Sequence, residues 1–243
     1  MKYYEFGAEN EKKCMLIHGM VTTWERSFAK LIPELCKNFH VIAVALDGHN
    51  PDEDSTFNSI TKEARNVEQI LIDDFDSKVD VVYGSSLGGT VVIQMLANNR
   101  VKITKAIIEG TYATNYDFFS GIASKLMTSL SLKLIKGESA FILKMMGVKG
   151  KKDVEKLMYA GISEESLKNC YLSSYRYCLP EKIVTDTELQ FWYGSKELYP
   201  PKFAKKVMKL LPNMMIKVFE GMGHGEVLSD YAKLAEELNR YAD

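Results

Sequence analysis

The chain has 243 residues, of which 46% are hydrophobic, and its formal net charge is −1 at pH 7. This length suffices for one full core with an insertion, and the near-neutral charge gives a nucleic acid no basic surface to bind. The sequence contains no uninterrupted apolar stretch of 18 residues, and its first residues lack the apolar region of an export signal. We therefore expect a cytoplasmic protein with no membrane span and no nucleic-acid partner.

The four cysteines are far apart in the sequence. They are Cys14, Cys36, Cys170 and Cys178. None of them forms the C-x-x-C spacing of a zinc site, and their spread suits reduced, mostly buried thiols better than a disulfide framework. The sequence shows no cluster of metal ligands, so we expect neither a metal nor an organic cofactor.

Short apolar runs typical of strands alternate with amphipathic stretches typical of helices. The expected strands are Cys14–Ile17, Val41–Leu46, Val79–Tyr83, Ile103–Ile108, Leu189–Tyr193 and Met214–Phe219. The expected helices are Trp24–Lys37, Ile60–Phe75, Thr90–Asn99, Pro201–Leu211 and Val227–Tyr241. Such alternation favours right-handed crossovers, so the sequence predicts an α/β fold with a doubly wound, mostly parallel sheet.

One long segment interrupts this alternation. Residues 111–187 have helical patterning without a convincing strand, in the pieces Phe118–Ile135, Ser139–Met146, Lys152–Ala160 and Glu164–Tyr177. Because the segment leaves after one strand and returns before the next, we expect it above the C-terminal edge of the sheet, where open α/β folds bind ligands. The sequence therefore predicts a core of residues 1–110 and 188–243 with a helical cap of residues 111–187.

The pentapeptide from Gly84 to Gly88 fits the G-x-S-x-G nucleophile elbow, and Ser86 is its central serine. It lies between an expected strand and an expected helix, which is the order that this motif requires. Such a sharp turn exposes the serine hydroxyl at a helix N-terminus, and side chains at its glycine positions would collide with neighbouring segments. A glycine-rich turn without chemistry is the alternative interpretation. We take Ser86 as the candidate nucleophile.

A serine hydroxyl needs a base, and the chain has four histidines. His224 follows the last expected strand in a loop with three glycines, which would let it reach the sheet edge. We expect His18 and His49 to hold their own loops and His40 to lie on the surface. His224 is therefore the candidate base.

The base in turn needs a carboxylate that fixes its tautomer. Glu197 is the only acid in the turn after the strand Leu189–Tyr193. Glu109, at the end of the strand Ile103–Ile108, is the alternative acid. Glu197 is preferred because the triad acid belongs after the later strand.

These motifs resemble those of the α/β-hydrolase superfamily, particularly its small esterase and thioesterase-like members with a helical cap. The resemblance covers essentially the whole chain and depends on His18-Gly19-Met20, Asp47-Gly48-His49, the elbow, Gly194 to Glu197, and Gly223-His224. The order Ser86, Glu197, His224 is the order of that family's triad. The resemblance also implies an oxyanion hole formed by the backbone N–H groups of Met20 and Leu87.

The sequence departs from the family pattern in several places. Most relatives have aspartate where this chain has Glu197, which keeps Glu109 open as the acid. The usual Gly-His-Gly is Gly48-His49-Asn50, and the N-terminal strands are reduced to about Tyr3 to Gly7. The loop after His18 also lacks a run of three glycines, so lipases and esterases with that wider motif are poorer models.

The expected activity is that of a serine hydrolase that cleaves a small-molecule carboxylic ester or thioester through an acyl-enzyme. A carbon–carbon bond hydrolase or lyase that uses the same triad is one alternative. A non-catalytic ligand-binding module on a hydrolase scaffold is another, because a fold does not determine a function. The substrate-binding residues within 111–187 and the oligomeric state are not predicted.

Overall fold

The computed structural model describes residues 1–113, 119–136 and 158–241. Their strands are β1 (Lys2–Phe6), β2 (Lys13–Ile17), β3 (His40–Ala45), β4 (Lys78–Ser85), β5 (Lys102–Glu109), β6 (Glu188–Gly194) and β7 (Met215–Phe219). These seven strands form one sheet in the order β1-β3-β2-β4-β5-β6-β7. β1 pairs antiparallel with β3, and every other pairing is parallel. The predicted mostly parallel α/β sheet is confirmed.

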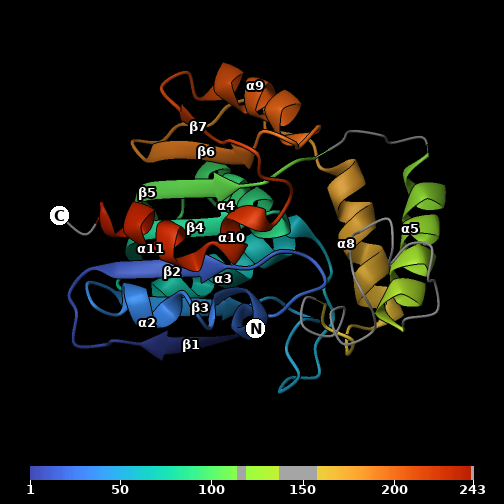
Figure 1. Ribbon diagram of the computed structural model, residues 1–243, viewed down its shortest axis with the longest axis horizontal. Helices are drawn as coiled ribbons and strands as arrows, with labels where there is room; N and C mark the ends of the chain where they lie inside the picture. Colours follow the sequence, from blue (N-terminus) through green and yellow to red (C-terminus); the bar gives the residue numbers. More distant parts are fainter. Residues whose placement is uncertain (114–118, 137–157, 242–243) are drawn as a thin grey trace.

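Helices cover both faces of this sheet (Figure 1). The first face packs against α3 (Ile60–Asp74), α4 (Leu87–Asn98) and α9 (Pro200–Leu210). The second face packs against α1 (Trp24–Phe28), α2 (Ile32–Leu35), α10 (Glu226–Ser229) and α11 (Tyr231–Asn239). Successive side chains of a strand point to opposite faces of the sheet. In β2, Met15 and Ile17 therefore pack on the first face, and Cys14 and Leu16 pack on the second. Burial on both faces explains the continuous apolar runs of the strands.

Two predicted helices are each divided in two, which corrects the expectation for Trp24–Lys37 and Val227–Tyr241. The first becomes α1 and α2, because Pro33 lies in the first turn of α2 and cannot donate to the carbonyl four residues earlier. The second becomes α10 and α11, because Asp230 leaves helical geometry and its side chain caps α11 by accepting from the Lys233 N–H.

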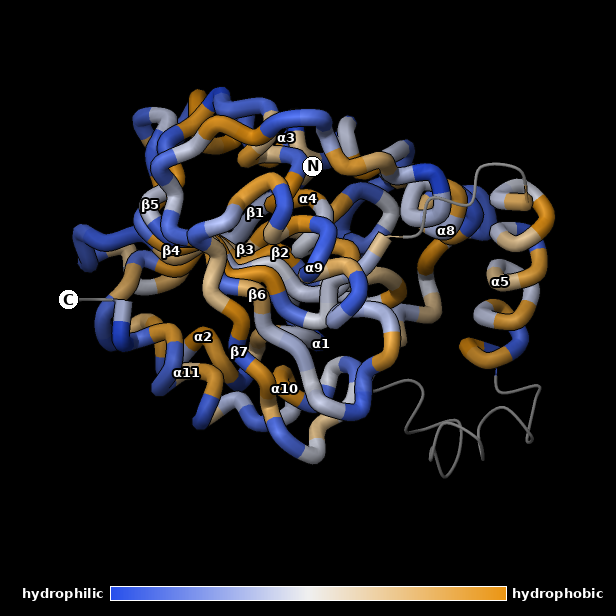
Figure 2. The backbone as a smooth tube through the Cα atoms, turned by 90° about the horizontal axis from the view of Figure 1, so that it is seen from above, coloured by the Kyte–Doolittle hydropathy of each residue, from blue (hydrophilic) through white to orange (hydrophobic). Residues whose placement is uncertain are grey.

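The segment between β5 and β6 contains the helices α5 (Ser120–Ile135) and α8 (Glu164–Arg176). They lie side by side beyond the carboxyl ends of the parallel strands (Figure 1) and stand apart from the sheet in the view from above (Figure 2). The Ser131 hydroxyl and the Tyr171 hydroxyl join them at 2.6 Å. The predicted helix Ser139–Met146 and most of Lys152–Ala160 lie outside the described residues. The helices α5 and α8 therefore lie where ligands of open α/β sheets bind.

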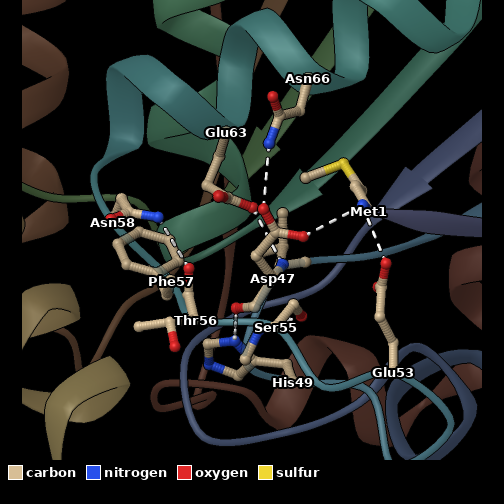
Figure 3. A network of polar contacts seen from close by, with 12 residues as sticks. Met1, Asp47, His49, Glu53, Ser55, Thr56, Phe57, Asn58, Glu63 and Asn66 are labelled. Carbon is tan, nitrogen blue, oxygen red and sulfur yellow. Dashed lines mark hydrogen bonds and ion pairs between the residues drawn. The ribbon is translucent and has the colours of Figure 1, made fainter.

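The loop after β3 is anchored by a network of buried acids (Figure 3). The Met1 amine lies 3.3 Å from Asp47 Oδ1 and 3.1 Å from Glu53 Oε1. The Asp47 N–H donates to Glu63 Oε2 at 3.0 Å, and Asn66 donates to Asp47 Oδ2 at 3.0 Å. Burial, together with the charge of Asp47, raises the pKa of Glu63 to about 8. The network therefore holds a carboxyl that keeps its proton near neutral pH.

This raised pKa predicts a pH-dependent stability. Between the ordinary pKa of 4.5 and about 8, folded Glu63 keeps a proton that the unfolded chain releases. The free energy of unfolding should therefore fall as the pH rises through this window. Glu63→Gln, whose amide imitates the protonated acid, should flatten that slope in urea unfolding at pH 5 and pH 8. Glu181→Gln at an exposed position is the control. An unchanged slope in Glu63→Gln would contradict the assignment.

Candidate functional site

Ser86 lies at the junction of β4 and α4, in the centre of the sheet. Its backbone has φ 52° and ψ −113°, a conformation that is strained for any residue with a side chain. A Cβ at Gly88 would collide with the carbonyl oxygen of Ile17 in β2, and one at Gly84 would lie 2.7 Å from the Gly88 carbonyl oxygen. The glycines thus allow the tight turn that presents Ser86 at the first turn of α4.

The loop after β2 lies against this serine. A Cβ at Gly19 would be 3.2 Å from Ser86 Cβ, which places Met20, the next residue, beside the elbow. His18 is fully buried, its Nε2 accepts from the Leu46 N–H at 3.2 Å, and its Nδ1 lies 2.8 Å from the Gly19 carbonyl oxygen. Burial lowers the pKa of His18 to about 3. His18 therefore holds the loop as a neutral ring, as the sequence indicated.

His49 and His40 are also held by contacts within the fold. His49 is buried with its Nδ1 3.0 Å from the Asp47 carbonyl oxygen, and burial lowers its pKa to about 4. His40 was expected on the surface, which is wrong: it begins β3, is 9% exposed and lies 2.8 Å from Glu5 Oε2. The antiparallel pairing of β1 with β3 brings this glutamate to His40, a contact that the local sequence could not reveal.

His224 and Glu197 are in direct contact. His224 Nδ1 lies 2.7 Å from Glu197 Oε2. The other carboxylate oxygen accepts from the Gly194 N–H at 2.8 Å, and the Glu197 N–H donates back to the Gly194 carbonyl at 3.0 Å. The carboxylate therefore folds back on the end of β6, which is how a side chain one methylene longer than aspartate meets the imidazole.

The turn of Glu197 and the loop of His224 are packed on each other. The Lys196 N–H donates to the Met222 carbonyl at 3.0 Å. A Cβ at Gly194 would collide with that same carbonyl oxygen. The loop turns on both sides of the histidine, with Gly221 at φ 75° and Gly225 at φ 76°. These contacts fix the position of His224, whose side chain is 49% exposed.

Glu109, the alternative acid, has different partners. Its side chain is fully buried, and Oε2 accepts from the Ser85 hydroxyl at 2.8 Å. Oε1 has no hydrogen-bond partner in the described part of the chain. Burial raises the pKa of Glu109, with the Glu197 charge also acting in that direction. Of the two acids, Glu197 is the one that hydrogen-bonds to His224.

Gly110 lies against the His224 ring, directly after the residue that binds the Ser86 backbone, and the sequence did not point to it. The Ser86 N–H donates to the Glu109 carbonyl at 2.7 Å, so Ser86 is adjacent to the end of β5. A Cβ on the next residue, Gly110, would lie 3.1 Å from both Cε1 and Nδ1 of His224. Its φ of 57° also suits glycine. The one feature of the sequence that could have identified Gly110 is its position just after a predicted strand, at the sheet edge where the other candidate residues lie.

The charges around His224 alter its affinity for a proton. Burial lowers the pKa of His224, but the hydrogen bond and charge of Glu197, aided by the charge of Glu109, outweigh burial and raise it above 6.5. The ring therefore gains stability as an imidazolium. Among the described residues, no hydrogen bond joins Ser86 Oγ to this ring, although both lie beside the end of β5.

The described residues contain no group of three or more histidine, cysteine or acidic side chains that could hold a metal ion. None of the helices in this part of the chain is both long and apolar enough to cross a membrane. All four cysteines are free thiols, with Cys14 and Cys170 buried and Cys178 exposed.

The comparisons with known proteins point to one family. A family model described as the alpha/beta hydrolase family matches residues 14–237. An alpha/beta hydrolase family protein from Desulfitobacterium hafniense has a similar structure, with a TM-score of 0.86, 25% identity and 100% of each chain covered. A carboxylesterase structure from Nitrososphaera gargenis has a TM-score of 0.76 at 18% identity, covering 99% of this chain and 93% of that one. The epoxide hydrolase CorEH has a TM-score of 0.73 at 16% identity, covering 99% and 98%. No curated protein sequence matches this chain.

The contacts of the two acids predict different effects on His224. In an NMR titration, the His224 imidazole of the wild type should have a pKa above 6.5. Glu197→Gln should lower this pKa strongly, because it removes the charge beside Nδ1 and leaves one amide oxygen in place of two carboxylate acceptors. Glu109→Gln should lower it less, because it removes only a charge. A larger shift in Glu109→Gln than in Glu197→Gln would contradict the assignment.

Proposed function

Because the chain belongs to the alpha/beta hydrolase family, we propose that this hydrolase is a serine esterase or thioesterase with Ser86, His224 and Glu197 as its catalytic triad. The observation that carries the proposal is the 2.7 Å contact of His224 with Glu197 at the same sheet edge as the strained elbow of Ser86. Strain of this kind, held by close packing, is typical of functional positions. The substrate is a small-molecule carboxylic ester or thioester.

The reaction begins when Ser86 Oγ attacks the carbonyl carbon and its proton passes to His224 Nε2. The tetrahedral intermediate then collapses, so that the bond from the carbonyl carbon to the leaving oxygen or sulfur breaks. His224 gives its proton to the departing alcohol or thiol. Water attacks the resulting acyl-enzyme with His224 again as base, which releases the acid and restores Ser86. Each proton that His224 accepts is thus given back within the cycle.

The oxyanion of the intermediate is bound by the backbone N–H groups of Met20 and Leu87. Leu87 is the first residue of α4, where a helix leaves its N–H groups without intrahelical partners and favours negative charge. Met20 follows Gly19, which lies against Ser86. Each such donor contributes about 3 kcal/mol to transition-state stabilisation.

Glu197 holds His224 with Nε2 available for the serine and stabilises the imidazolium that forms. The raised pKa of His224 strengthens it as a base but keeps it protonated to higher pH. Catalytic hydrogen bonds are often long in a free enzyme and shorten in the substrate complex. We accordingly expect Ser86 Oγ and His224 Nε2 to approach each other when substrate binds.

Residues 111–187 act in this proposal as a cap that selects the substrate. Ser166 of α8 accepts from the Phe57 N–H at 3.2 Å, and Ser173 accepts from the Ile60 N–H at 3.0 Å. These bonds join α8 to the loop before α3 and to the first residue of α3, beyond the ends of the strands. α8 and its partner α5 are thus anchored beside the edge of the sheet that carries Ser86.

Hydrolysis of p-nitrophenyl esters of increasing acyl length tests the nucleophile. Ser86→Ala should lower kcat by about 10⁴-fold or more, since its hydroxyl forms the acyl-enzyme. Ser129→Ala, at an exposed position of α5, is the matched control and should retain activity. The kcat/KM of the wild type should rise with pH through a pKa above 6.5, because only neutral His224 accepts the proton. Full activity in Ser86→Ala, or a flat profile from pH 5 to 8, would refute the proposal.

Gly110→Ala tests whether the close packing of Gly110 against the ring positions His224. The new Cβ would lie 3.1 Å from the His224 ring at a residue with φ 57°, so it should displace the imidazole. We expect kcat/KM to fall by about 10- to 100-fold, because small misplacements of catalytic groups are costly. Gly121→Ala is the control, since a Cβ there meets nothing within 4 Å. Equal activity of the two variants would show that Gly110 does not position His224.

A further inference from the structure

A stacked pair of tyrosines lies beside the His224 ring. Tyr112 follows Gly110 by two residues in the loop after β5, and Tyr199 follows Glu197 by two residues directly before α9. Their rings stack on each other with centroids 5.5 Å apart and an interplanar angle of 28°. The Tyr112 ring also meets the His224 ring edge-on, at 6.1 Å and 71°. We call Tyr112 and Tyr199 the tyrosine pair.

The tyrosine pair is open to an incoming molecule. Tyr112 is 38% exposed and Tyr199 is 52% exposed. Large aromatic side chains contribute most to binding when a partner covers them, and they do so at little cost in conformational entropy. An uncovered pair that touches a histidine is therefore a surface on which a ligand can gain contact.

A second stacked pair lies nearby on α8. Tyr171 and Tyr175 have centroids 6.2 Å apart at 26°. Burial raises the pKa of Tyr175 to about 12, and the neighbouring phenols of Tyr171, Tyr112 and Tyr199 add to this. The second pair thus lies within electrostatic range of the tyrosine pair.

The position of the tyrosine pair assigns it to one part of the substrate. In ester cleavage the histidine gives its proton to the leaving oxygen, so the leaving group must lie against the His224 ring. Tyr112 is in contact with that ring. We propose that the tyrosine pair is a subsite for the leaving group and that it selects esters of arylmethyl alcohols over those of saturated alcohols of the same size. This inference rests on the proposed function.

The stacking favours an aromatic leaving group over other groups of similar bulk. A third ring can stack on the outer face of a stacked pair or meet it edge-on. Such ring contacts contribute more binding free energy than the burial of the same apolar area alone. A quaternary ammonium group is bound best within a cage of several ring faces. At 28° the two rings turn most of their faces toward each other and leave an outer face rather than a cage.

Two acetate esters with leaving groups of similar bulk test this subsite. Benzyl acetate and cyclohexylmethyl acetate share the acyl group and are both esters of primary alcohols. We expect kcat/KM to be about three- to tenfold higher for benzyl acetate. Tyr112→Leu and Tyr199→Leu should bring the ratio toward one, whereas Tyr199→Phe, which keeps the ring, should preserve it. Tyr231→Leu on α11 is the control and should leave the ratio unchanged.

The outcomes separate this inference from the proposed function. Cleavage of both esters at equal kcat/KM, or a ratio that the two leucine variants leave unchanged, would overturn the subsite while leaving the esterase intact. A preference for acetylcholine over benzyl acetate would overturn it as well, in favour of a cation site.

Binding to Ser86→Ala tests the subsite without turnover. Benzyl alcohol should shift the ring resonances of Tyr112 and Tyr199 in NMR spectra and bind more tightly than cyclohexylmethanol. Equal or weaker binding of benzyl alcohol would refute the subsite even if no acetate ester were cleaved. The absence of all Ser86-dependent cleavage would count against the proposed function instead.

Discussion

At the carboxyl ends of β2, β4, β5 and β6, neighbouring backbone segments approach one another more closely than side chains would allow. A Cβ at Gly88 would collide with the end of β2, and one at Gly194 would collide with the loop that carries His224. Gly110 likewise leaves room for the His224 ring. Ser86 keeps its strained backbone conformation because the packing of these segments outweighs the residue's own backbone preference. The remaining geometry of the site depends on this close packing.

The site also separates two carboxylates that start from neighbouring strands. Glu197 is held by the Gly194 N–H and by His224, so both of its oxygens have partners. Glu109 is turned inward onto Ser85, where burial raises its pKa. A hydrogen-bonded carboxylate can stabilise an adjacent positive charge, whereas a buried acid with a raised pKa does so less. The two acids thus have different physical roles although both are near His224.

Local patterns in the sequence predicted most of the fold because each depends on only a few neighbouring residues. The apolar runs of the buried strands and the elbow around Ser86 were placed to within two residues of the observed elements. The helix breaks at Pro33 and Asp230 were missed, since a helical apolar spacing continues across both. The burial of His40 was missed for another reason: its partner Glu5 reaches it through pairing between distant segments.

The sequence by itself determined the alternating elements, the serine elbow and the glycine-flanked His224, because periodicity and turn chemistry are local properties. It left Glu197 and Glu109 as rival acids, since both follow parallel strands and both ends lie at the same sheet edge. Only the tertiary structure decided which of them contacts His224, because that depends on how the loop after β7 packs on Gly194. The contacts of Gly110, Tyr112 and Tyr199 likewise arise only when segments far apart in sequence are brought together.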